Sequence, residues 1–172
     1  ALFSFLSTIA FHLPLFSQTI SKEEMVFLTS EWKGERFADG RPKIADKLLE
    51  RAKLIMIDDA WTVLKNEGYL NQFEGNWKTV NETPMTGRAI TAMYMPSRPD
   101  LEKNIKDRGA KQGRKGNTNS WPIDILTHGD IYIADAFGKI SGGSIMGATL
   151  ANSIFSKSGN GVVFNGAARD LQ

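Results

Sequence analysis

The 172-residue chain contains no cysteine, which excludes disulfides, thiolate nucleophiles and cysteine metal sites. It has only two histidines, His12 and His128, and they lie too far apart to show metal-ligand spacing. Any metal must therefore be held by carboxylates and water, the ligands that hard cations such as Mg²⁺ prefer. The formal net charge of +2 is too small to indicate a nucleic-acid partner by itself.

Charge is also missing from the first 21 residues, and residues 1–16 are mostly apolar. This run is short for a bilayer span, which needs about 20 apolar residues. It is typical of the apolar core and tail of a secretory signal peptide cleaved near Ser17 or Gln18. We therefore expect residues 1–18 to be a signal-peptide remnant of an exported (periplasmic or secreted) protein, with no stable membrane span after processing. The alternatives are a membrane anchor and a buried amino-terminal helix of a cytoplasmic protein.

Helical and strand patterns then alternate, as is typical of an α/β fold. Residues 43–67 carry an apolar stripe at helical spacing, with Asp58-Asp59 as a break or new cap inside the helix. Residues 69–83 are rich in Asn and Gly and indicate a loop, with Trp77 packed against the body. Residues 86–95 alternate in size and polarity and predict a strand.

Residues 98–120 form a basic segment, which we interpret as a solvated surface insertion. Its seven basic residues face three acids, and its glycines limit any helix to about residues 100–108. The basic residues are Arg98, Lys103, Lys106, Arg108, Lys111, Arg114 and Lys115. The alternative is an electrostatic patch for an anionic ligand or nucleic acid. Since no aromatic residue is interleaved here to stack on bases, we expect no nucleic-acid partner.

The carboxyl-terminal 43 residues predict a strand, helix, strand unit. Residues 131–137 read as the first strand, a helix opens at Gly147, and residues 161–165 read as the second strand. In such a unit the exit of the second strand can lie near the amino end of the preceding helix. We therefore expect Arg169 and Asp170 to lie near the start of that helix.

These residues together can bind a 2-oxo acid. The first backbone N–H groups of a helix, here those of Thr149 and Leu150, lack internal partners and can face an anion. Gly147 has no side chain to obstruct a close approach. Arg169 offers a planar fork for a carboxylate, and Asp170 is a hard oxygen ligand for Mg²⁺ or Mn²⁺. The alternative is that Arg169 and Asp170 form only a surface ion pair.

Four pieces of the sequence resemble the RraA-like family, which contains the class II 4-hydroxy-4-methyl-2-oxoglutarate aldolases and the regulators of ribonuclease E activity. They are Gly87-Arg-Ala-Ile-Thr91, Gly129-Asp-Ile-Tyr-Ile-Ala-Asp135, Gly147, and Gly161-Val-Val-Phe-Asn-Gly-Ala-Ala-Arg-Asp170. The resemblance covers roughly residues 43–172, with the basic segment as an insertion. It implies a swivelling β/β/α domain and a homotrimer or hexamer. The domain, placed at residues 19–172, would be truncated at its carboxyl end.

The resemblance also implies roles for single residues. Arg169 is similar to the arginine that binds the substrate carboxylate, and Asp170 to the residue that holds the divalent metal, so both are candidate catalytic residues. Gly147, Thr149 and Leu150 match the helix start that contacts the 2-oxo acid. Aldolase members carry an acid where this chain has Ala148. A neighbour such as Asp135, or another subunit, would have to compensate for its absence.

Three functions follow from this reading. The first is a class II, metal-dependent lyase that uses Mg²⁺ or Mn²⁺ on 2-oxo acids. It would cleave 4-hydroxy-4-methyl-2-oxoglutarate, decarboxylate oxaloacetate, or both, and release pyruvate. The second is a non-catalytic regulator of ribonuclease activity, which an export signal argues against. The third is a degenerate family member that binds a small anion.

Overall fold

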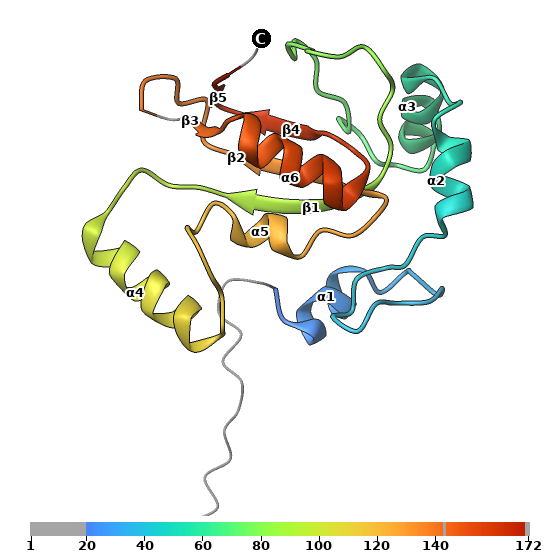
Figure 1. Ribbon diagram of the computed structural model, residues 1–172. Coiled ribbons are helices and arrows are strands. Elements are labelled where there is room, and N and C mark those ends of the chain that lie inside the picture. The colour runs from blue at the N-terminus through green and yellow to red at the C-terminus, as the bar shows by residue number, and fades with distance from the viewer. Residues whose placement is uncertain (1–19, 143, 171–172) are drawn as a thin grey trace, which may run out of the picture. The chain divides into compact units, whose positions relative to one another are not determined.

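The computed structural model describes residues 20–142 and 144–170 (Figure 1). The expected signal-peptide remnant, residues 1–18, lies outside them. The chain divides between Ile44 and Ala45 into two compact units. Within the described residues, no helix has both the length and the hydropathy that a membrane span requires.

The first unit contains helix α1 (Lys22–Leu28) and a loop closed by an isolated antiparallel bridge between Arg36 and Pro42. Ser21 caps α1, because its hydroxyl accepts the backbone N–H of Glu24 at 3.1 Å. The Arg36 guanidinium donates to the hydroxyl and the carbonyl oxygen of Thr29, at 2.7 and 2.6 Å. One arginine thus joins the end of α1 to the loop.

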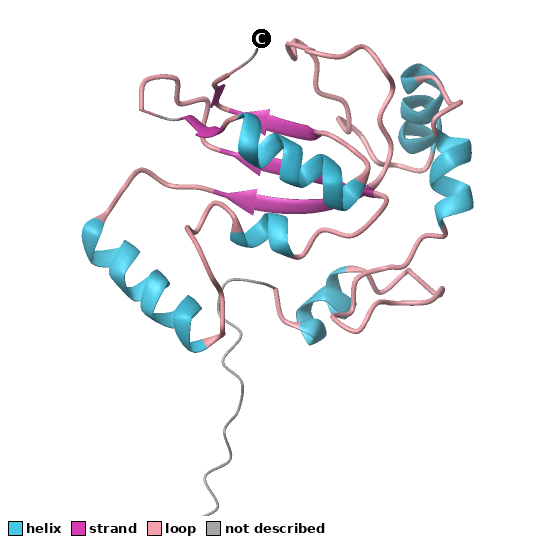
Figure 2. Cartoon of the chain, in the orientation of Figure 1, coloured by secondary structure: helices cyan, strands magenta, loops and turns pink. Residues whose placement is uncertain are grey.

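The second unit is a mixture of helices and parallel strands, which confirms the α/β class (Figure 2). A three-stranded parallel sheet has the order β1-β2-β4, and β3 and β5 form a separate parallel pair. The elements are α2 (Asp46–Ala52), α3 (Ile57–Asn66), β1 (Arg88–Met93), α4 (Pro99–Lys111), α5 (Trp121–Asp124), β2 (Asp130–Asp135), β3 (Ser144–Met146), α6 (Ala148–Ser158), β4 (Val162–Asn165) and β5 (Ala167–Ala168).

The core lies where α5 and α6 pack against one face of the three-stranded sheet (Figure 1). Ile90 of β1 and Tyr132 of β2 are neighbours in the register and face the helices. Ile123 of α5 and Ile154 of α6 fill the space against them, each 1% exposed. The β2-α6-β4 unit is therefore the strand, helix, strand unit expected from the sequence, with β2 and β4 parallel and adjacent.

A pair of tyrosine hydroxyls lies inside this core. The Tyr94 and Tyr132 oxygens are 2.6 Å apart, and the Tyr94 hydroxyl also donates to the carbonyl oxygen of Asn119 at 3.3 Å. Burial raises the pKa of both phenols, and the hydrogen bond to Tyr94 raises that of Tyr132 further. The folded chain therefore favours the neutral pair.

We predict that this pair makes stability fall in alkali. Because both folded-state pKa values are raised, the pair's contribution is complete below the unfolded-state value of about 10 and is lost as pH rises above it. The double variant Tyr94→Phe with Tyr132→Phe should lose less stability between neutral and alkaline pH than the parent does. Urea unfolding at a series of pH values measures this, and equal alkaline losses in both proteins would contradict it.

The region before β1 differs from its expected form. Residues 43–67 form two helices, α2 and α3, and the break expected at Asp58-Asp59 lies just before these residues, between Ala52 and Ile57. Leu49 is the only buried member of the apolar stripe, and Ile55 and Met56 are exposed. The expected packing of Trp77 is also wrong, because its side chain is exposed. A stripe at helical spacing predicts a helix, but it does not supply the surface that covers it.

One further boundary differs. α4 runs to Lys111, past the expected end near Arg108, because the bare Gly109 lets the helix approach the Trp121 ring. The loop at 69–83 and the strand after it are confirmed.

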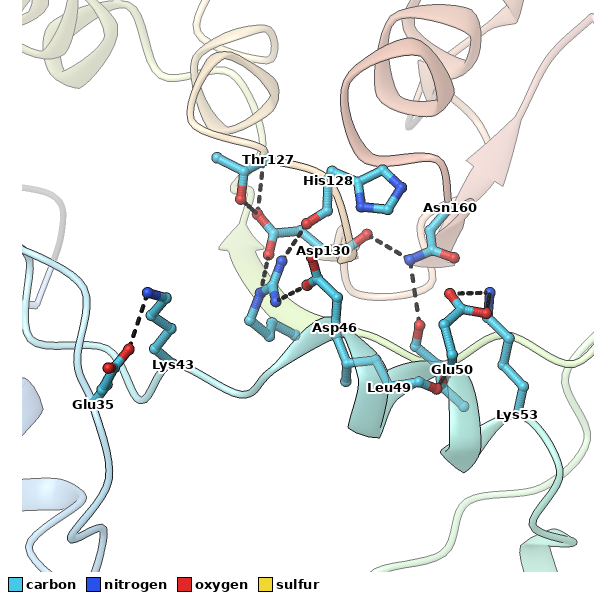
Figure 3. Close-up of polar contacts among 12 residues, drawn as sticks. Glu35, Lys43, Asp46, Leu49, Glu50, Lys53, Thr127, His128, Asp130 and Asn160 are labelled. Atoms are coloured by element: carbon cyan, nitrogen blue, oxygen red, sulfur yellow. Dashed lines mark hydrogen bonds and ion pairs between the residues drawn. The ribbon is translucent and has the colours of Figure 1, made fainter.

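A buried ion pair fastens β1 to β2 at the edge where both strands begin (Figure 3). The Asp130 side chain is 0% exposed and accepts the Arg88 Nε–H at 2.9 Å. It also accepts the backbone N–H and the hydroxyl of Thr127, both at 2.8 Å (Figure 3). Arg88 further donates to the His128 carbonyl and to Asp46. Asp130, in the Gly-Asp pattern at the start of β2, therefore has a structural role: it holds β1 and β2 together.

Candidate functional site

The short β3–β5 pair brings the last described residues to the start of α6. Ala167 and Ala168 of β5 pair in parallel with Ser144 and Met146 of β3, and the chain enters α6 directly after β3. The Arg169 backbone N–H continues this pairing and donates to the Met146 carbonyl at 3.0 Å. Arg169 and Asp170 therefore lie beside the residue that caps α6, as expected from the sequence.

The first turn of α6 presents free backbone donors at this point. Gly147 is the N-cap, and the first intrahelical bond runs from the Ala151 N–H to the Gly147 carbonyl. The N–H groups of Ala148, Thr149 and Leu150 precede it, so no carbonyl of the helix accepts them. Ala148 donates instead to the Asp170 carboxylate at 3.4 Å. A carboxylate at the amino end of a helix also gains from the helix dipole.

Gly147 allows this close approach. A Cβ atom built on it would lie 2.7 Å from Asp170 Oδ2 and 2.9 Å from Arg169 Nε. Its backbone is extended, with φ −143° and ψ −179°, which any residue can adopt. Glycine is therefore needed here for space and not for its conformational freedom.

Arg169 and Asp170 are open to ligands. Their side chains are 71% and 56% exposed, and Arg169 Nε lies 3.7 Å from Asp170 Oδ2. A loose, exposed pair of this kind contributes about 0–1 kcal/mol. Asp170 also has a left-handed backbone with φ +62°, an uncommon conformation for a residue other than glycine. Strain of this kind gathers at functional sites.

The donor set for a metal is small. In residues 20–142 and 144–170, no three His, Asp or Glu side chains lie close enough to share an ion. Asp135 is one candidate to compensate for the acid that the resemblance implies at Ala148. It accepts the Phe137 N–H at 2.8 Å and the Asn165 amide at 2.9 Å, so it holds the exits of β2 and β4. Among the residues that the structure describes, Asp170 alone is seen to offer a carboxylate at the start of α6. This fits Mg²⁺ only where water and substrate oxygens complete the shell, as they commonly do for this ion.

Residues 42–172 match the family described as RraA-like, Aldolase/RraA. The chain belongs to the RraA-like family. Neither the curated proteins nor the solved structures gave a match. The RraA-like family includes both aldolases and regulators, so membership by itself does not choose between catalysis and binding.

Sequence reasoning did not find the element that positions the site. β3 and β5 are three and two residues long, too short to produce a recognisable alternation. The one available signal was Ser144-Ile-Met146, two apolar residues between a glycine turn and a helix start.

Proposed function

We propose that this chain is a divalent-metal-dependent lyase for 2-oxo acids, releasing pyruvate from 4-hydroxy-4-methyl-2-oxoglutarate, oxaloacetate or both. One observation carries the proposal: Arg169 and Asp170 meet the free amides of α6 across the bare backbone of Gly147. A cationic fork, helix amides and a hard carboxylate are thereby gathered within one short stretch of surface.

Each group matches one part of the substrate. The Arg169 guanidinium can donate two parallel hydrogen bonds to the substrate carboxylate. The Thr149 and Leu150 N–H groups add donors and the positive end of the helix dipole. Together they hold the 2-oxo end of the molecule in one orientation, so that the bond to be broken is fixed relative to Asp170.

Asp170 is the residue that would hold Mg²⁺ or Mn²⁺. Its Oδ2 faces the Ala148 N–H, while its Oδ1 has no hydrogen-bond partner within the described part of the chain. A bound ion would supply Lewis-acid stabilisation of the negative charge that develops on the keto oxygen as the C–C bond breaks. Ala148 offers no oxygen to position water or take a proton, so proton transfer falls to water.

The test is pyruvate release from both substrates by the full-length protein, with Mg²⁺ and with EDTA, in parallel with Arg169→Ala and Asp170→Ala. We expect metal-dependent turnover that both substitutions reduce to the metal-only background. Arg98→Ala is the matched control, since Arg98 is also an exposed arginine paired to an aspartate, at 2.6 Å, but lies before α4. No turnover above background from a folded protein would refute the lyase and favour the degenerate anion binder.

Gly147→Ala should separate activity from stability. The new methyl group would press on Asp170 Oδ2 and Arg169 Nε, which are exposed side-chain atoms that can move aside. We expect the melting temperature to change by no more than about 2 °C, since surface changes usually cost under about 0.5 kcal/mol. The value of kcat/KM should fall about 10- to 100-fold as the two groups leave their positions. A variant with unchanged kcat/KM would show that the approach of Arg169 and Asp170 to α6 is not used.

Assembly and location are part of the same proposal. We propose a homotrimer or hexamer that is exported, with a regulator of ribonuclease activity as the alternative function. Light scattering of the purified protein measures the oligomeric state, and cell fractionation measures the location. Inhibition of ribonuclease E by a cytoplasmic form would support the alternative.

A further inference from the structure

A hollow of about 400 Å³ lies between the carboxyl end of α4 and helix α5. This volume is within the range of small-molecule sites, about 300–1,000 Å³. Its lining comprises Gln112, Gly113, Arg114, Lys115, Trp121, Asp124 and Ile125. The proposed lyase uses none of them.

Arg114 is held in place within this hollow. Its guanidinium carbon lies 5.4 Å from the centre of the Trp121 ring, and its Nε–H donates to the Gln112 side-chain oxygen at 3.2 Å. Trp121 is itself fixed, since its indole N–H donates to the Lys115 carbonyl at 2.9 Å and its ring packs on Gly109. The two terminal nitrogens of Arg114 have no acceptor among the residues that the structure describes. A positioned fork with unused donors is thus presented to the hollow.

The charges around the hollow favour an anion. The three acids of the basic segment are already paired, in the contacts Arg98–Asp100, Lys103–Asp107 and Lys106–Glu102. From residue 108 to residue 123 the chain has four basic residues and no acid. The acid that lines the hollow, Asp124, is matched by Lys157 at 3.3 Å. Arg114 and Lys115 therefore carry unmatched positive charge at its wall.

We propose that this hollow binds the phosphate group of a small phosphomonoester. Arg114 would hold the phosphate oxygens with its two free nitrogens, a planar match that a guanidinium makes better than an ammonium. Lys115 adds a second charge at the rim, and the exposed Ile125 contacts the organic part of the ligand. An alternative role for basic residues at the carboxyl end of a helix is to stabilise the helix dipole, and this explains the position of Lys111 at the end of α4. It does not account for Arg114, which follows the helix and turns onto Trp121.

The experiment is a titration of the full chain with inorganic phosphate and with phenyl phosphate. The Trp121 indole N–H resonance reports the site, and those of Trp61 and Trp77 serve as internal references. We expect saturable shifts confined to Trp121, with phenyl phosphate binding more tightly because it also covers Ile125. Arg114→Gln should weaken both about tenfold or more, and Arg114→Lys several-fold, since lysine keeps the charge without the fork.

Lys103→Gln is the control. Like Arg114→Gln it removes one positive charge from the basic segment, but Lys103 lies in α4 and is already paired with Asp107 at 2.5 Å. It should change the affinity by less than about twofold. No saturable shift below about 10 mM, or equal loss in Arg114→Gln and Lys103→Gln, overturns the proposal. Binding of a single-stranded oligonucleotide that neither phosphate probe displaces would also overturn it, in favour of a polyanion.

Discussion

Replacing Asp130 with alanine is expected to lower the free energy of unfolding by about 3–5 kcal/mol. The carboxylate is fully buried and accepts hydrogen bonds from Arg88 and, twice, from Thr127. Its loss leaves the Arg88 guanidinium, 10% exposed, without its buried counter-charge. Since domains of this size are stable by only about 5–15 kcal/mol, the variant should be near the limit of folding.

Asp46→Ala is the matched control for this prediction. Asp46 contacts the same guanidinium at 3.0 Å, but its side chain is 65% exposed. Its removal should cost about 0–1 kcal/mol, because water replaces an exposed carboxylate at little cost. Urea unfolding of both variants measures the difference. Equal losses would show that burial does not decide the strength of this pair.

The loss of stability in Asp130→Ala should also involve elements other than β1 and β2. Burial lowers the pKa of Arg88, but the hydrogen bonds and charges of Asp130 and Asp46 together raise it above its ordinary value. The arginine therefore stays charged wherever the chain is folded. The Asn160 amide also donates to the Asp130 carbonyl at 3.1 Å and to the Thr86 carbonyl at 3.3 Å (Figure 3). The starts of β1, β2 and β4 are thus tied to one cluster.

The sequence predicted best where local pattern and burial agree. The β2-α6-β4 unit has apolar strands, a capped helix and glycine boundaries, and all of these signals act in the same direction. The approach of Arg169 and Asp170 to Gly147 could be predicted because it follows from the handedness and direction of such a unit.

The sequence predicted worst where a pairing is short or a partner surface is needed. The β3–β5 pair joins two very short strands across the intervening residues 147–166, so no local pattern specifies it. The apolar stripe over residues 43–67 predicted helices from its spacing alone, yet most of its members, Met56 and Val63 among them, are exposed. Helical periodicity shows that one face of a helix is apolar, but it does not predict which element packs against that face.

The last prediction concerns Ala148, where the resemblance to the aldolase members implies an acid. Ala148→Asp should raise cleavage of 4-hydroxy-4-methyl-2-oxoglutarate by about 10²-fold or more, the range of a positioned general base. Aldol cleavage must remove a proton from the substrate hydroxyl, whereas oxaloacetate breaks its C–C bond by losing CO₂ without that step. Decarboxylation should therefore rise far less, and the ratio of the two rates is the measurement.

The local geometry allows the substitution. Ala148 is exposed at the first residue of α6, so a larger side chain displaces nothing, and an acid there suits the helix dipole. The Ala148 backbone nitrogen lies 3.4 Å from Asp170 Oδ2, so the carboxylate introduced by Ala148→Asp would lie near that of Asp170. Without a metal, the carboxylates of Asp170 and of the introduced aspartate repel each other, whereas a bound divalent ion would attract both. Mg²⁺ should therefore raise the melting temperature of Ala148→Asp more than that of the parent. Ala151→Asp adds the same charge one turn later, and if it matches Ala148→Asp in both measurements, the position of the acid is not what the chemistry needs.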